Sequence, residues 1–599
     1  MIPLVDGLFA LFDDDSGGAL LLTGGRRCEF AADASPREGL AALETTARQG
    51  RWLAIAAPYE LGGVLDPAAT VKTTSDRLSL ASLGFASWAF DEARTLDRSA
   101  VPLFLDTCLA ALPEEQRLAG VAEVLCAVDR LAYGAQVRQI RRWIADGDCY
   151  QINLTFPLTF RVYGHPLALY AGLRSRQPVR YGGCLISDTS TILSLSPELF
   201  FERCGNQVRT RPMKGTAPRG ATAAADVRIR AELLASEKER AENVMIVDLL
   251  RNDLGRLAEP GRVRVESLFE AEAYPTVWQL VSTVSAELPG VSLAELFTAL
   301  FPCGSITGAP KLRAMQRIAE LEGSPRGLYT GAFGWLAPNG DCRFNVAIRT
   351  LEIDRSRRGR LGVGSGIVAE ADPAGEYAEC TLKARFLTGY DPGFALIETL
   401  RLEEGVFPLL AGHLRRLQSS ADALGFACEM PAIVAALRHE ASHRPQGVYR
   451  VRLTLNHDGD HQLSTEPLIV PEERVGRVVF AEQTLDAEHY LRRHKTTARA
   501  IYERALASVA GRPEVFDVIF CNTRGEVCEG ARSNLFVERA GRLLTPPLSC
   551  GLLPGVLRQS LLDAGRAFEQ MLLPADLRAG EPVYVGNALR GLRQVTIEN

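Results

Sequence analysis

The sequence has 599 residues, of which 47% are hydrophobic and 23% charged, with a formal net charge of -5. A chain of this length exceeds what one hydrophobic core supports, so two to four domains are expected. The small negative charge gives no sign of nucleic-acid binding, and no apolar run is long enough to span a bilayer.

The cysteines indicate the compartment. Thirteen of them are scattered singly along the chain, and this odd number forms no Cys-x-x-Cys pair. Reduced thiols are therefore predicted rather than a disulfide framework. The first ten residues lack the basic start of a signal peptide. A cytoplasmic protein is expected.

The first 390 residues alternate predicted strands and helices. Short apolar runs between turn residues predict strands, and longer amphipathic runs predict helices. The predicted strands lie at 19–22, 52–56, 103–105, 149–156 and 191–195, and the predicted helices at 119–146 and 223–254. Because these elements interleave without a regular strand–helix–strand repeat, the predicted fold class is α+β.

A break in the pattern lies near residue 390. Residues 388–393 combine two glycines, a proline and an aspartate, which is typical of a linker. A new pattern follows, with strands predicted at 395–402 and 448–455 and a helix at 413–424. We therefore expect two domains, at 1–389 and 390–599.

A basic stretch at 209–220 carries Lys214 among three arginines, two prolines and two glycines. The prolines and glycines exclude a helix. Nearby arginines would favour the neutral amine of Lys214, and a neutral amine can act as a nucleophile. The alternative is a basic loop that holds an anionic ligand. The stretch by itself does not decide between these two interpretations.

Two pairs of glutamates share a spacing that places each pair on one helix face. Glu239 and Glu242 are three residues apart, as are Glu376 and Glu379. Asp372 is the expected N-cap of the second helix, with a proline at its first position. Two such faces opposite each other would form an oxygen-ligand site that suits Mg²⁺. The alternative is two solvated helix faces.

Three further segments contain candidates for binding an anion. Residues 301–311 and 362–368 are rich in small residues, which let backbone N–H groups approach an anion. Residues 343–350 place Arg349 at a strand end, where a guanidinium can hold a carboxylate with two hydrogen bonds.

Together these segments resemble the chorismate-utilising family, which includes anthranilate synthase component I, aminodeoxychorismate synthase component I, and isochorismate and salicylate synthases. Matching segments also occur at 147–154, 195–198, 241–243 and 248–254. The resemblance implies a large two-layered α/β sandwich. It implies Mg²⁺ at Glu242 and Glu379, supported by Glu239 and Glu376. It also implies that chorismate binds at Arg349, Tyr329, Ser305, Gly364 and Gly366, with Lys383 on the face of Glu379.

Within that family, two positions favour aminodeoxychorismate synthase. Lys214 stands where anthranilate synthases usually have alanine, and the resemblance implies that it displaces the 4-hydroxyl of chorismate before ammonia replaces it. Gln279 stands where anthranilate synthases usually have a histidine. No glutaminase unit is visible, so ammonia is expected from a separate glutamine amidotransferase subunit.

The second unit contains a lysine and a distant acid, Lys495 and Glu529. Each taken singly reads as a surface charge. Together with 413–417 and 551–558 they resemble fold-type IV pyridoxal-phosphate enzymes. The resemblance implies Lys495 as the Schiff-base lysine and Glu529 as the partner of the pyridine nitrogen. The phosphate group is expected at Arg416, Val556 and Leu557, near Asn587. The family also implies a homodimer.

The pairing of the units suggests a reaction sequence. The expected enzyme makes 4-amino-4-deoxychorismate in the first unit and converts it to 4-aminobenzoate and pyruvate in the second, supplying a folate precursor. The alternative is an anthranilate-type synthase fused to an aminotransferase, since the sequence of the second unit alone does not separate a lyase from an aminotransferase.

Overall fold

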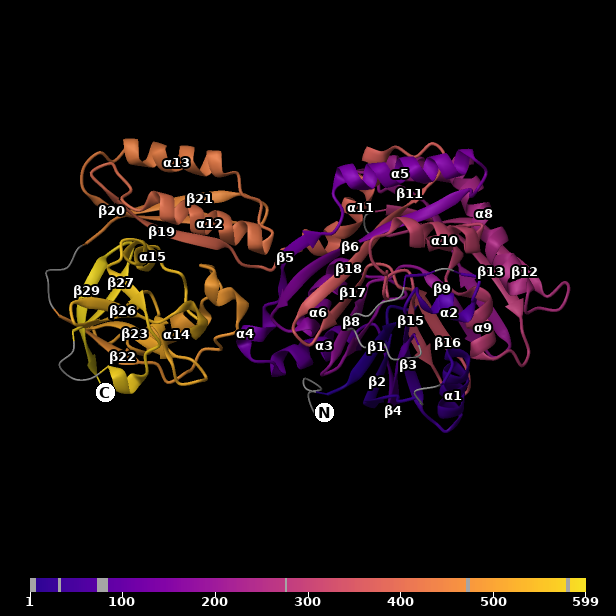
Figure 1. Cartoon of the computed structure of the whole chain (residues 1–599), viewed down its shortest axis with the longest axis horizontal. Helices are drawn as coiled ribbons and strands as arrows, with labels where there is room; N and C mark the ends of the chain where they lie inside the picture. The colour runs from indigo at the N-terminus through magenta and orange to yellow at the C-terminus, as the bar shows by residue number, and fades with distance from the viewer. Residues whose placement is uncertain are drawn as a thin grey trace. The chain divides into compact units, whose positions relative to one another are not determined.

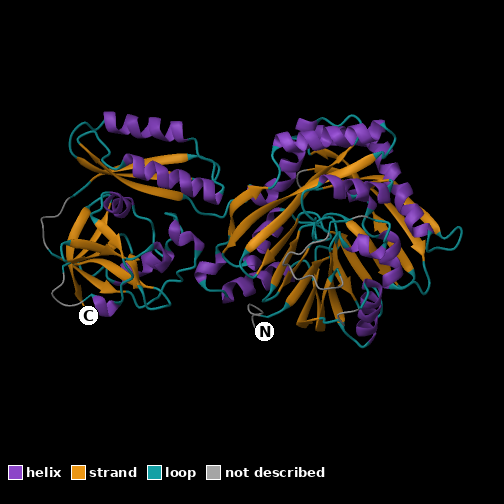
Figure 2. Ribbon diagram, in the orientation of Figure 1, coloured by secondary structure: helices purple, strands orange, loops and turns teal. Residues whose placement is uncertain are grey.

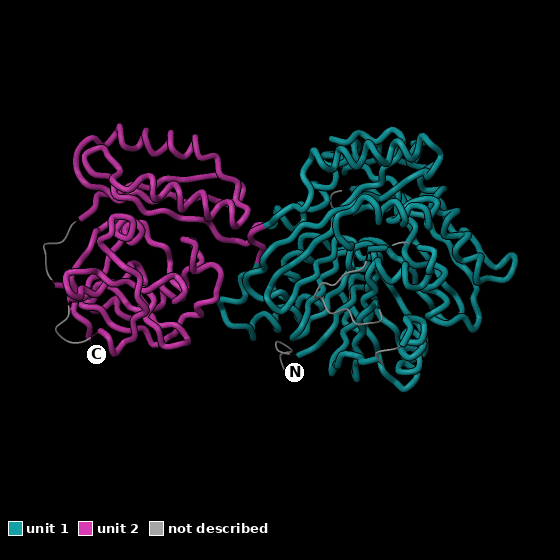
Figure 3. Tube along the Cα trace, viewed as in Figure 1, with its two compact units in different colours: residues 1–119, 124–390 teal, residues 120–123, 391–599 magenta. Residues whose placement is uncertain are grey.

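The computed structural model describes residues 7–30, 34–69, 71–72, 84–274, 277–469, 475–577 and 582–598. The chain forms two compact units (Figure 3). Unit 1 comprises Met1–Ala119 and Val124–Tyr390, and unit 2 comprises Gly120–Glu123 and Asp391–Asn599. The expectation of no signal peptide falls largely on residues 1–6, which lie outside the described residues.

Unit 1 is built on an antiparallel sheet that folds into two facing layers (Figure 1). Following the hydrogen-bonded pairs, the strands run β12 (Val263–Ala273), β13 (Val277–Glu287), β10 (Gln207–Arg211), β9 (Leu199–Cys204), β16 (Cys342–Val346), β15 (Ala332–Leu336), β3 (Trp52–Ala57), β4 (Ala86–Leu96), β2 (Ala19–Arg27), β1 (Phe9–Asp13), β7 (Gly183–Ile186), β8 (Ser190–Ser194), β17 (Thr350–Asp354), β18 (Arg358–Ile367), β6 (Gln151–Tyr163) and β14 (Gly308–Ala309). β11 (Met213–Pro218) also pairs with β13.

Helices cover the outside of this sheet (Figure 2). They are α1 (Pro36–Arg48), α2 (Leu61–Leu65), α3 (Ala100–Ala111), α4 (Glu114–Arg117), α5 (Arg130–Ala145), α6 (Pro166–Arg176), α7 (Ala223–Ala235), α8 (Glu237–Gly255), α9 (Leu293–Leu300), α10 (Lys311–Leu321) and α11 (Pro373–Thr388), with a 3-10 turn η1 (Gly304–Ile306). α8 packs against β11, β12 and β13, whereas α5 and α11 pack side by side over β18.

The side chains on the two faces of β3 belong to two different hydrophobic clusters. Leu53 and Ile55 of β3 join a cluster that includes side chains of α1 and α9, whereas Ala54 and Ala56 face the opposite way. In that second cluster the rings of Phe12 and Phe333 lie 4.9 Å apart, although their strands do not pair. The second cluster therefore fills the space between the two layers of the sheet.

Three predicted elements of unit 1 differ from the structure. Residues 103–105 lie within α3 rather than in a strand, because the flanking alanines and leucines continue the helix. The first part of the predicted helix 119–146 is the strand β5 (Gly120–Cys126), and α5 starts only after Asp129 caps it. The predicted helix 223–254 is two helices, because the Ser236 side chain accepts from the backbone N–H of Glu239 and starts α8.

Unit 2 has two sheets. The first is antiparallel, with β19 (Leu396–Glu403), β20 (Val448–Leu455) and β21 (His461–Pro467) beside α12 (Leu410–Leu424) and α13 (Met430–Ser442). The second runs β24 (Val527–Gly530), β23 (Val515–Cys521), β22 (Gly476–Phe480), β29 (Gly591–Glu598), β28 (Val583–Asn587), β25 (Asn534–Arg539), β26 (Arg542–Thr545) and β27 (Ala567–Glu569). Also present are α14 (Ala500–Ser508), α15 (Val556–Asp563) and the 3-10 turns η2 (Tyr490–Arg493), η3 (Leu548–Cys550) and η4 (Pro574–Asp576).

The predicted strands and helix of unit 2 are present with small shifts at their ends. β19 also runs beside the segment that carries Lys495, because the backbone N–H of Ile397 donates to the Lys495 carbonyl over 2.9 Å. The α+β fold class is confirmed for the chain. In the described ranges no helix is long and apolar enough to cross a membrane.

Candidate active sites

Lys214 lies half-buried on β11, and backbone contacts fix its position. The Asn243 side chain on α8 donates to the Lys214 carbonyl over 3.4 Å and accepts from Ser282 over 2.6 Å. Gly215 follows at φ +95°, a conformation that favours glycine. Burial lowers the pKa of the Lys214 amine, the negative charge of Glu198 opposes this, and the positive charge of Lys383 adds to it.

The expectation that the neighbouring arginines tune Lys214 is wrong. Arg209 pairs with Glu202 over 3.2 Å, and Arg211 pairs with Glu272 over 2.6 Å. Arg219 donates to both oxygens of Asp226. All three guanidinium groups are therefore used to hold strands and a helix together. The sequence could not show this because their acidic partners lie on other elements.

Glu198, which lies in the matching segment 195–198, is a further candidate site residue. It lies after β8, is 4% exposed and accepts a 2.6 Å hydrogen bond from Ser305 in η1. Burial raises the pKa of its carboxyl group, whereas Ser305 and the charge of Lys214 oppose the increase. The carboxyl group of Glu198 therefore holds a proton more readily than that of an exposed glutamate. Its signal in the sequence is its place in the matching segment 195–198.

The glycines of β18 leave room beside Lys214. A Cβ at Gly366 would lie 2.4 Å from Gln151 Nε2 and 3.6 Å from Lys214 Nζ. Gln151 is 2% exposed, and its Oε1 has no hydrogen-bond partner among the described residues. The carbonyl of Gly364 accepts from Lys383 over 2.9 Å. Lys214, Gln151 and the glycine strand therefore form one wall of a polar site.

The four predicted metal ligands lie on α8 and α11. Burial raises the pKa of Glu239, and the charges of Glu242 and Glu379 raise it further. Burial and the charge of Glu379 likewise raise the pKa of Glu376. Glu379 also pairs with Lys383 over 2.7 Å. A negative charge on α11 therefore raises the pKa of a carboxyl group on α8. Among the described residues, however, no three His, Cys, Asp or Glu side chains are already arranged to hold a metal ion.

Arg349 combines a strained backbone with an unused guanidinium. Its φ is +48°, and its carbonyl accepts from Leu195 over 3.0 Å. Among the described residues its side chain forms no hydrogen bond or ion pair. Burial lowers the pKa of this guanidinium. A desolvated cation without an acidic partner is suited to bind the carboxylate of a ligand.

Tyr329 packs against the same glycine strand. A Cβ at Gly362 would lie 2.1 Å from the ring of Tyr329, so only glycine fits there. Tyr329 is 7% exposed, and burial raises the pKa of its hydroxyl group. Gly362, Gly364 and Gly366 alternate along β18 and so share one face. This face carries Tyr329 at one end and Lys214 at the other.

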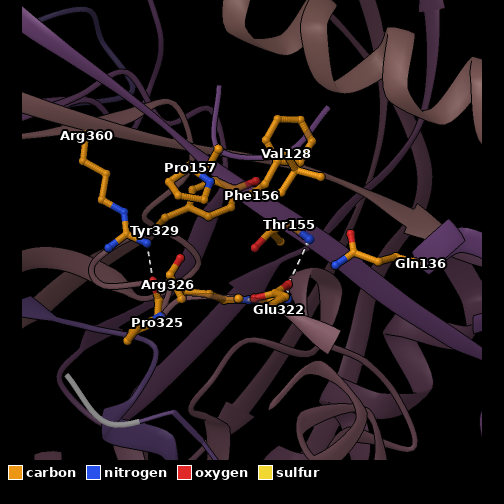
Figure 4. Close-up of a pocket in the computed structure, with 14 residues that line it drawn as sticks. Val128, Gln136, Thr155, Phe156, Pro157, Glu322, Pro325, Arg326, Tyr329 and Arg360 are labelled. Carbon is orange, nitrogen blue, oxygen red and sulfur yellow. Dashed lines mark hydrogen bonds and ion pairs between the residues drawn. The ribbon is translucent and has the colours of Figure 1, made fainter. Parts of the chain in front are cut away.

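A cavity of about 280 Å³ opens beside Tyr329 (Figure 4). Arg360 and Gln136 lie on opposite sides of it, and Glu322 and Arg326 lie below (Figure 4). Glu322 accepts from the Thr155 backbone over 2.9 Å and from Arg326 over 2.8 Å. Arg326 in turn donates to the Asn153 carbonyl over 2.6 Å. This buried ion pair ties the segment before Tyr329 to β6.

In unit 2 the amine of Lys495 is influenced by two sets of charged side chains, one around Glu529 and one around Arg416. Burial lowers the pKa of Lys495 to about 7, and the charges of Arg499 and Arg416 contribute. On one side Glu529 is 5% exposed and accepts from the Tyr502 hydroxyl over 2.7 Å and from the Leu553 backbone over 3.0 Å. Burial raises the pKa of Glu529.

On the other side Arg416 is held by Glu398. Arg416 donates to both carboxylate oxygens, over 2.8 and 2.6 Å, and His413 contacts the second oxygen over 2.6 Å. Burial opposes the ionisation of Glu398, yet the charge of Arg416 and these hydrogen bonds hold its pKa at about 2. Arg416 also donates to the Pro554 carbonyl, beside Val556 at the start of α15. Glu398 was missed because its partners lie 15 and 18 residues away.

The remaining predicted cofactor residues lie at two turns. Val556 and Leu557 begin α15 after Gly555, where backbone N–H groups point outward. Asn587 closes the turn between β28 and β29 by accepting from the backbone of Leu589 and Arg590. Its Nδ2 donates to the Arg532 carbonyl over 3.0 Å. The Asn587 amide is therefore used by the protein itself.

Comparison with known proteins supports the two halves separately. Residues 26–389 match the sequence profile of the chorismate binding enzymes. The chain belongs to this family. Residues 395–597 of this chorismate binding enzyme match amino-transferase class IV, which implies pyridoxal phosphate as a cofactor. The predictions of both families are confirmed.

Relatives of this chorismate binding enzyme carry the names of two activities. Aminodeoxychorismate synthase of Streptomyces pristinaespiralis is 43% identical over 50% of this chain and 41% of that protein. Anthranilate synthase component 1 3 of Haloarcula marismortui is 42% identical over 43% of this chain and 51% of that protein. The chain spans about half the length of the curated relatives it matches. The structure of anthranilate synthase component I from Streptococcus pneumoniae, at 24% identity, covers 63% of this chain and 90% of that one with a TM-score of 0.51, which shows the fold.

Proposed function

We propose that unit 1 converts chorismate and ammonia to 4-amino-4-deoxychorismate, and that unit 2 converts this product to 4-aminobenzoate and pyruvate. The observation that carries the proposal is Lys214, an amine with a lowered pKa beside the buried acid Glu198. A nucleophile and an acid at one point suit the replacement of a hydroxyl group by nitrogen.

Chorismate carries two carboxylates, and unit 1 offers a separate place for each. The unpaired guanidinium of Arg349 would hold the enolpyruvyl carboxylate, with Tyr329 and the backbone of Gly364 and Gly366 beside it. The second carboxylate would be held through Mg²⁺ at Glu242 and Glu379, supported by Glu239 and Glu376. The donor set fits this ion, because it consists of carboxylates from two helices that repel one another. When bound, Mg²⁺ would neutralise the ring carboxylate.

The proposed chemistry of unit 1 has two displacements. Neutral Lys214 attacks the ring and forms a C–N bond while the bond to the 4-hydroxyl breaks, and Glu198 donates a proton so that water leaves. Ammonia then forms the new C–N bond, and the bond to Lys214 breaks. The product ammonium returns a proton to Glu198. Gln151, whose Oε1 has no partner among the described residues, would accept a hydrogen bond from an N–H group during these steps.

In unit 2 the residues would hold the substrate and move a proton at the carbon beside its amine. Pyridoxal phosphate supplies a sink for negative charge at the carbon beside the amine. Lys495, with a pKa of about 7, can take a proton from that carbon and return one as pyruvate is eliminated. Glu529 would meet the ring nitrogen, and Arg416 with the start of α15 would hold the phosphate.

The proposal includes a partner and a compartment. The name component 1, which several of the relatives carry, supports a separate glutamine amidotransferase as the source of ammonia. Glutamine plus that subunit should then replace ammonium in the assay. We also propose a cytoplasmic location and a homodimer formed through unit 2.

The rival activity is that of an anthranilate-type synthase joined to an aminotransferase. Gln279 argues against it, because an amide cannot act as a base near neutral pH, and here its Oε1 accepts from Thr216 over 2.6 Å. One assay decides. The purified chain is incubated with chorismate, Mg²⁺, pyridoxal phosphate and ammonium, and the aromatic product is identified. 4-Aminobenzoate supports the proposal, whereas anthranilate or no turnover rejects it.

A further inference from the structure

Unit 2 carries a group of arginines around the turn between β28 and β29. Arg590 lies in this turn, and Asn587, at its start, binds the carbonyl of Arg532 over 3.0 Å. Arg401 donates to the carbonyl of Leu589 over 3.3 Å. Arg450 stands directly across from Arg401 in the antiparallel pair of β19 and β20. Four guanidinium-bearing residues from four segments therefore surround one turn.

The acidic residues nearby neutralise only part of this group. Glu403 pairs with Arg401 over 3.0 Å, and Glu466 lies 3.8 Å from Arg450. Asp517 is buried and accepts from Ser533 and from the backbone of Val518 and Arg532. In the part of the chain that the structure describes, the exposed guanidinium groups of Arg532 and Arg590 form no hydrogen bond or ion pair.

The positive charges also act on one another. The pKa of Arg590 is lowered by partial burial and by the charges of Arg532, Arg450 and Arg593, while the charge of Asp517 only partly opposes them. Like charges that are held together by backbone hydrogen bonds repel each other until an anion lies between them. A bound carboxylate would relieve this repulsion and accept two parallel hydrogen bonds from a guanidinium.

The arginine group adjoins the candidate cofactor site. Arg532 follows Glu529 by three residues, in a tight loop closed by the Gly530 N–H and the Ser533 carbonyl over 2.7 Å. The next residue, Asn534, donates to the Leu553 carbonyl, and the backbone N–H of Leu553 donates to Glu529. The loop that presents Arg532 is thus continuous with the residues that hold Glu529.

We propose that Arg590 and Arg532, supported by Arg450, form an anion site at the edge of the cofactor pocket that selects substrates with two carboxylates. The inference deepens the proposed function of unit 2 and rests on it. 4-Amino-4-deoxychorismate reacts through its amine and carries two carboxylates, so at least one must find a cation away from the reacting carbon. An aminotransferase acting on a monocarboxylate would have no use for this group.

The test measures binding at unit 2 alone, using the pyridoxal-phosphate-loaded full chain. Isophthalate, a dicarboxylate, and benzoate, a monocarboxylate, are titrated while the visible circular-dichroism band of the cofactor is followed, because this band does not report on unit 1. The wild type should bind isophthalate about tenfold more tightly than benzoate. Arg590→Gln and Arg532→Gln should each reduce this preference to less than about threefold. Arg590→Lys should retain most of it.

Arg438→Gln, which removes an exposed arginine from α13, is the matched control and should leave the preference unchanged. A preference that survives in both Gln variants, or that is absent in the wild type, would overturn the proposal. The second measurement is pyruvate release from supplied 4-amino-4-deoxychorismate, where the Gln variants should raise KM about tenfold with kcat nearly unchanged. If pyruvate is not released but the arginine-dependent preference remains, the lyase assignment fails and the anion site stands.

Discussion

The side-chain amines of Lys214 and Lys495 both have a lowered pKa, although their surroundings differ. Burial lowers the pKa of both amines. For Lys214 the added positive charge comes from Lys383, and the acid Glu198 works against it. For Lys495 two arginines contribute, and the pKa falls to about 7. Each lysine can therefore be neutral at a pH where an exposed lysine is charged, which is required of a nucleophile or a base.

Replacing the Lys214 amine tests its role as nucleophile. Lys214→Ala should reduce formation of 4-amino-4-deoxychorismate to less than about one hundredth of the wild-type rate, because the first displacement loses its nucleophile. Release of pyruvate from supplied 4-amino-4-deoxychorismate should stay normal. Both rates are measured by chromatography of the products. Arg228→Ala, at an exposed position of α7, is the control. Synthase activity retained in Lys214→Ala would rule out the covalent step.

Glu198→Gln tests the buried acid. The amide keeps a hydrogen-bond acceptor for Ser305 but cannot supply a proton, so the synthase rate should fall about a hundredfold. The pKa of Glu198 is raised and the pKa of Lys214 is lowered. The rate should increase with pH as Lys214 loses its proton and becomes a nucleophile. It should decrease at higher pH as Glu198 loses the proton that it must donate. The variant should lose the alkaline decrease. An unchanged pH–rate profile would exclude Glu198 as the acid, and Glu232→Gln on α7 serves as the control.

At the scale of elements, β18 and β19 position the two sites. β18 presents three glycines on one face, and each is in contact range of a side chain or backbone group of the site. β19 brings Glu398 to Arg416 while its neighbour Ile397 pairs with the Lys495 backbone. In each unit one strand therefore fixes the distance between candidate site residues that are far apart in the sequence.

A methyl group on β18 should displace Tyr329. In Gly362→Ala the new Cβ would lie 2.1 Å from the ring, so either the ring or the strand must move. We expect the free energy of unfolding to fall by about 1–3 kcal/mol and KM for chorismate to rise. Thermal unfolding and steady-state kinetics measure the two effects. Gly255→Ala, at the open end of α8, should change neither. A wild-type KM in Gly362→Ala would exclude Tyr329 from substrate binding.

The ion pair between Glu398 on β19 and Arg416 on α12 should strengthen the binding of pyridoxal phosphate. Glu398→Gln removes the charge that orients Arg416, so the dissociation constant of pyridoxal phosphate should increase about tenfold, as for a lost charged hydrogen bond. Fluorescence quenching during titration of the apoenzyme with cofactor measures this constant. Glu429→Gln, exposed at the start of α13, should bind as the wild type does. Equal affinity in Glu398→Gln would show that Arg416 does not need this partner.

The sequence predicted the helices and strands better than the side-chain contacts between them. The strand 448–455, the N-cap Asp372 and the family were all readable from local pattern and motif. The partners of Arg209, Arg211 and Arg219 were not, because they lie on other strands or, for Arg219, on the helix α7, and such pairs depend on how the elements pack. Glu398 was missed for a similar reason, because its partners Arg416 and His413 lie on α12. Spacing within one helix is visible in a sequence, whereas contacts between different elements need the fold, even at a separation of seven residues as for Arg209 and Glu202.

At the scale of the whole molecule, each unit has its own hydrophobic clusters and its own candidate site, with one sheet in unit 1 and two in unit 2. The two reactions can then be lost independently. We expect the Lys495→Ala chain to accumulate 4-amino-4-deoxychorismate from chorismate and ammonium. The Lys214→Ala chain should make none, although its unit 2 remains intact.

Mixing these two variant chains should restore 4-aminobenzoate, because the intermediate can leave one chain and reach unit 2 of another. The rate of 4-aminobenzoate formation, measured by absorbance after chromatography, should increase with the concentration of the Lys214→Ala chain. Each variant incubated alone is the control. No product in the mixture would mean that the intermediate passes only within one molecule, and the expectation of independent units would be wrong.

The continuous sheet of unit 1 also bears on how this unit folds. Lys214 lies near the β12 end of the hydrogen-bonded path and Gly366 near the β14 end, yet a Cβ at Gly366 would lie 3.6 Å from Lys214 Nζ. The strands between these two ends must therefore have paired before Lys214 and Gly366 come together. Pairs such as β3 with β15 join segments nearly 280 residues apart, and contacts over such separations form slowly. Synthase activity should accordingly be the last property to return when the denatured chain is refolded.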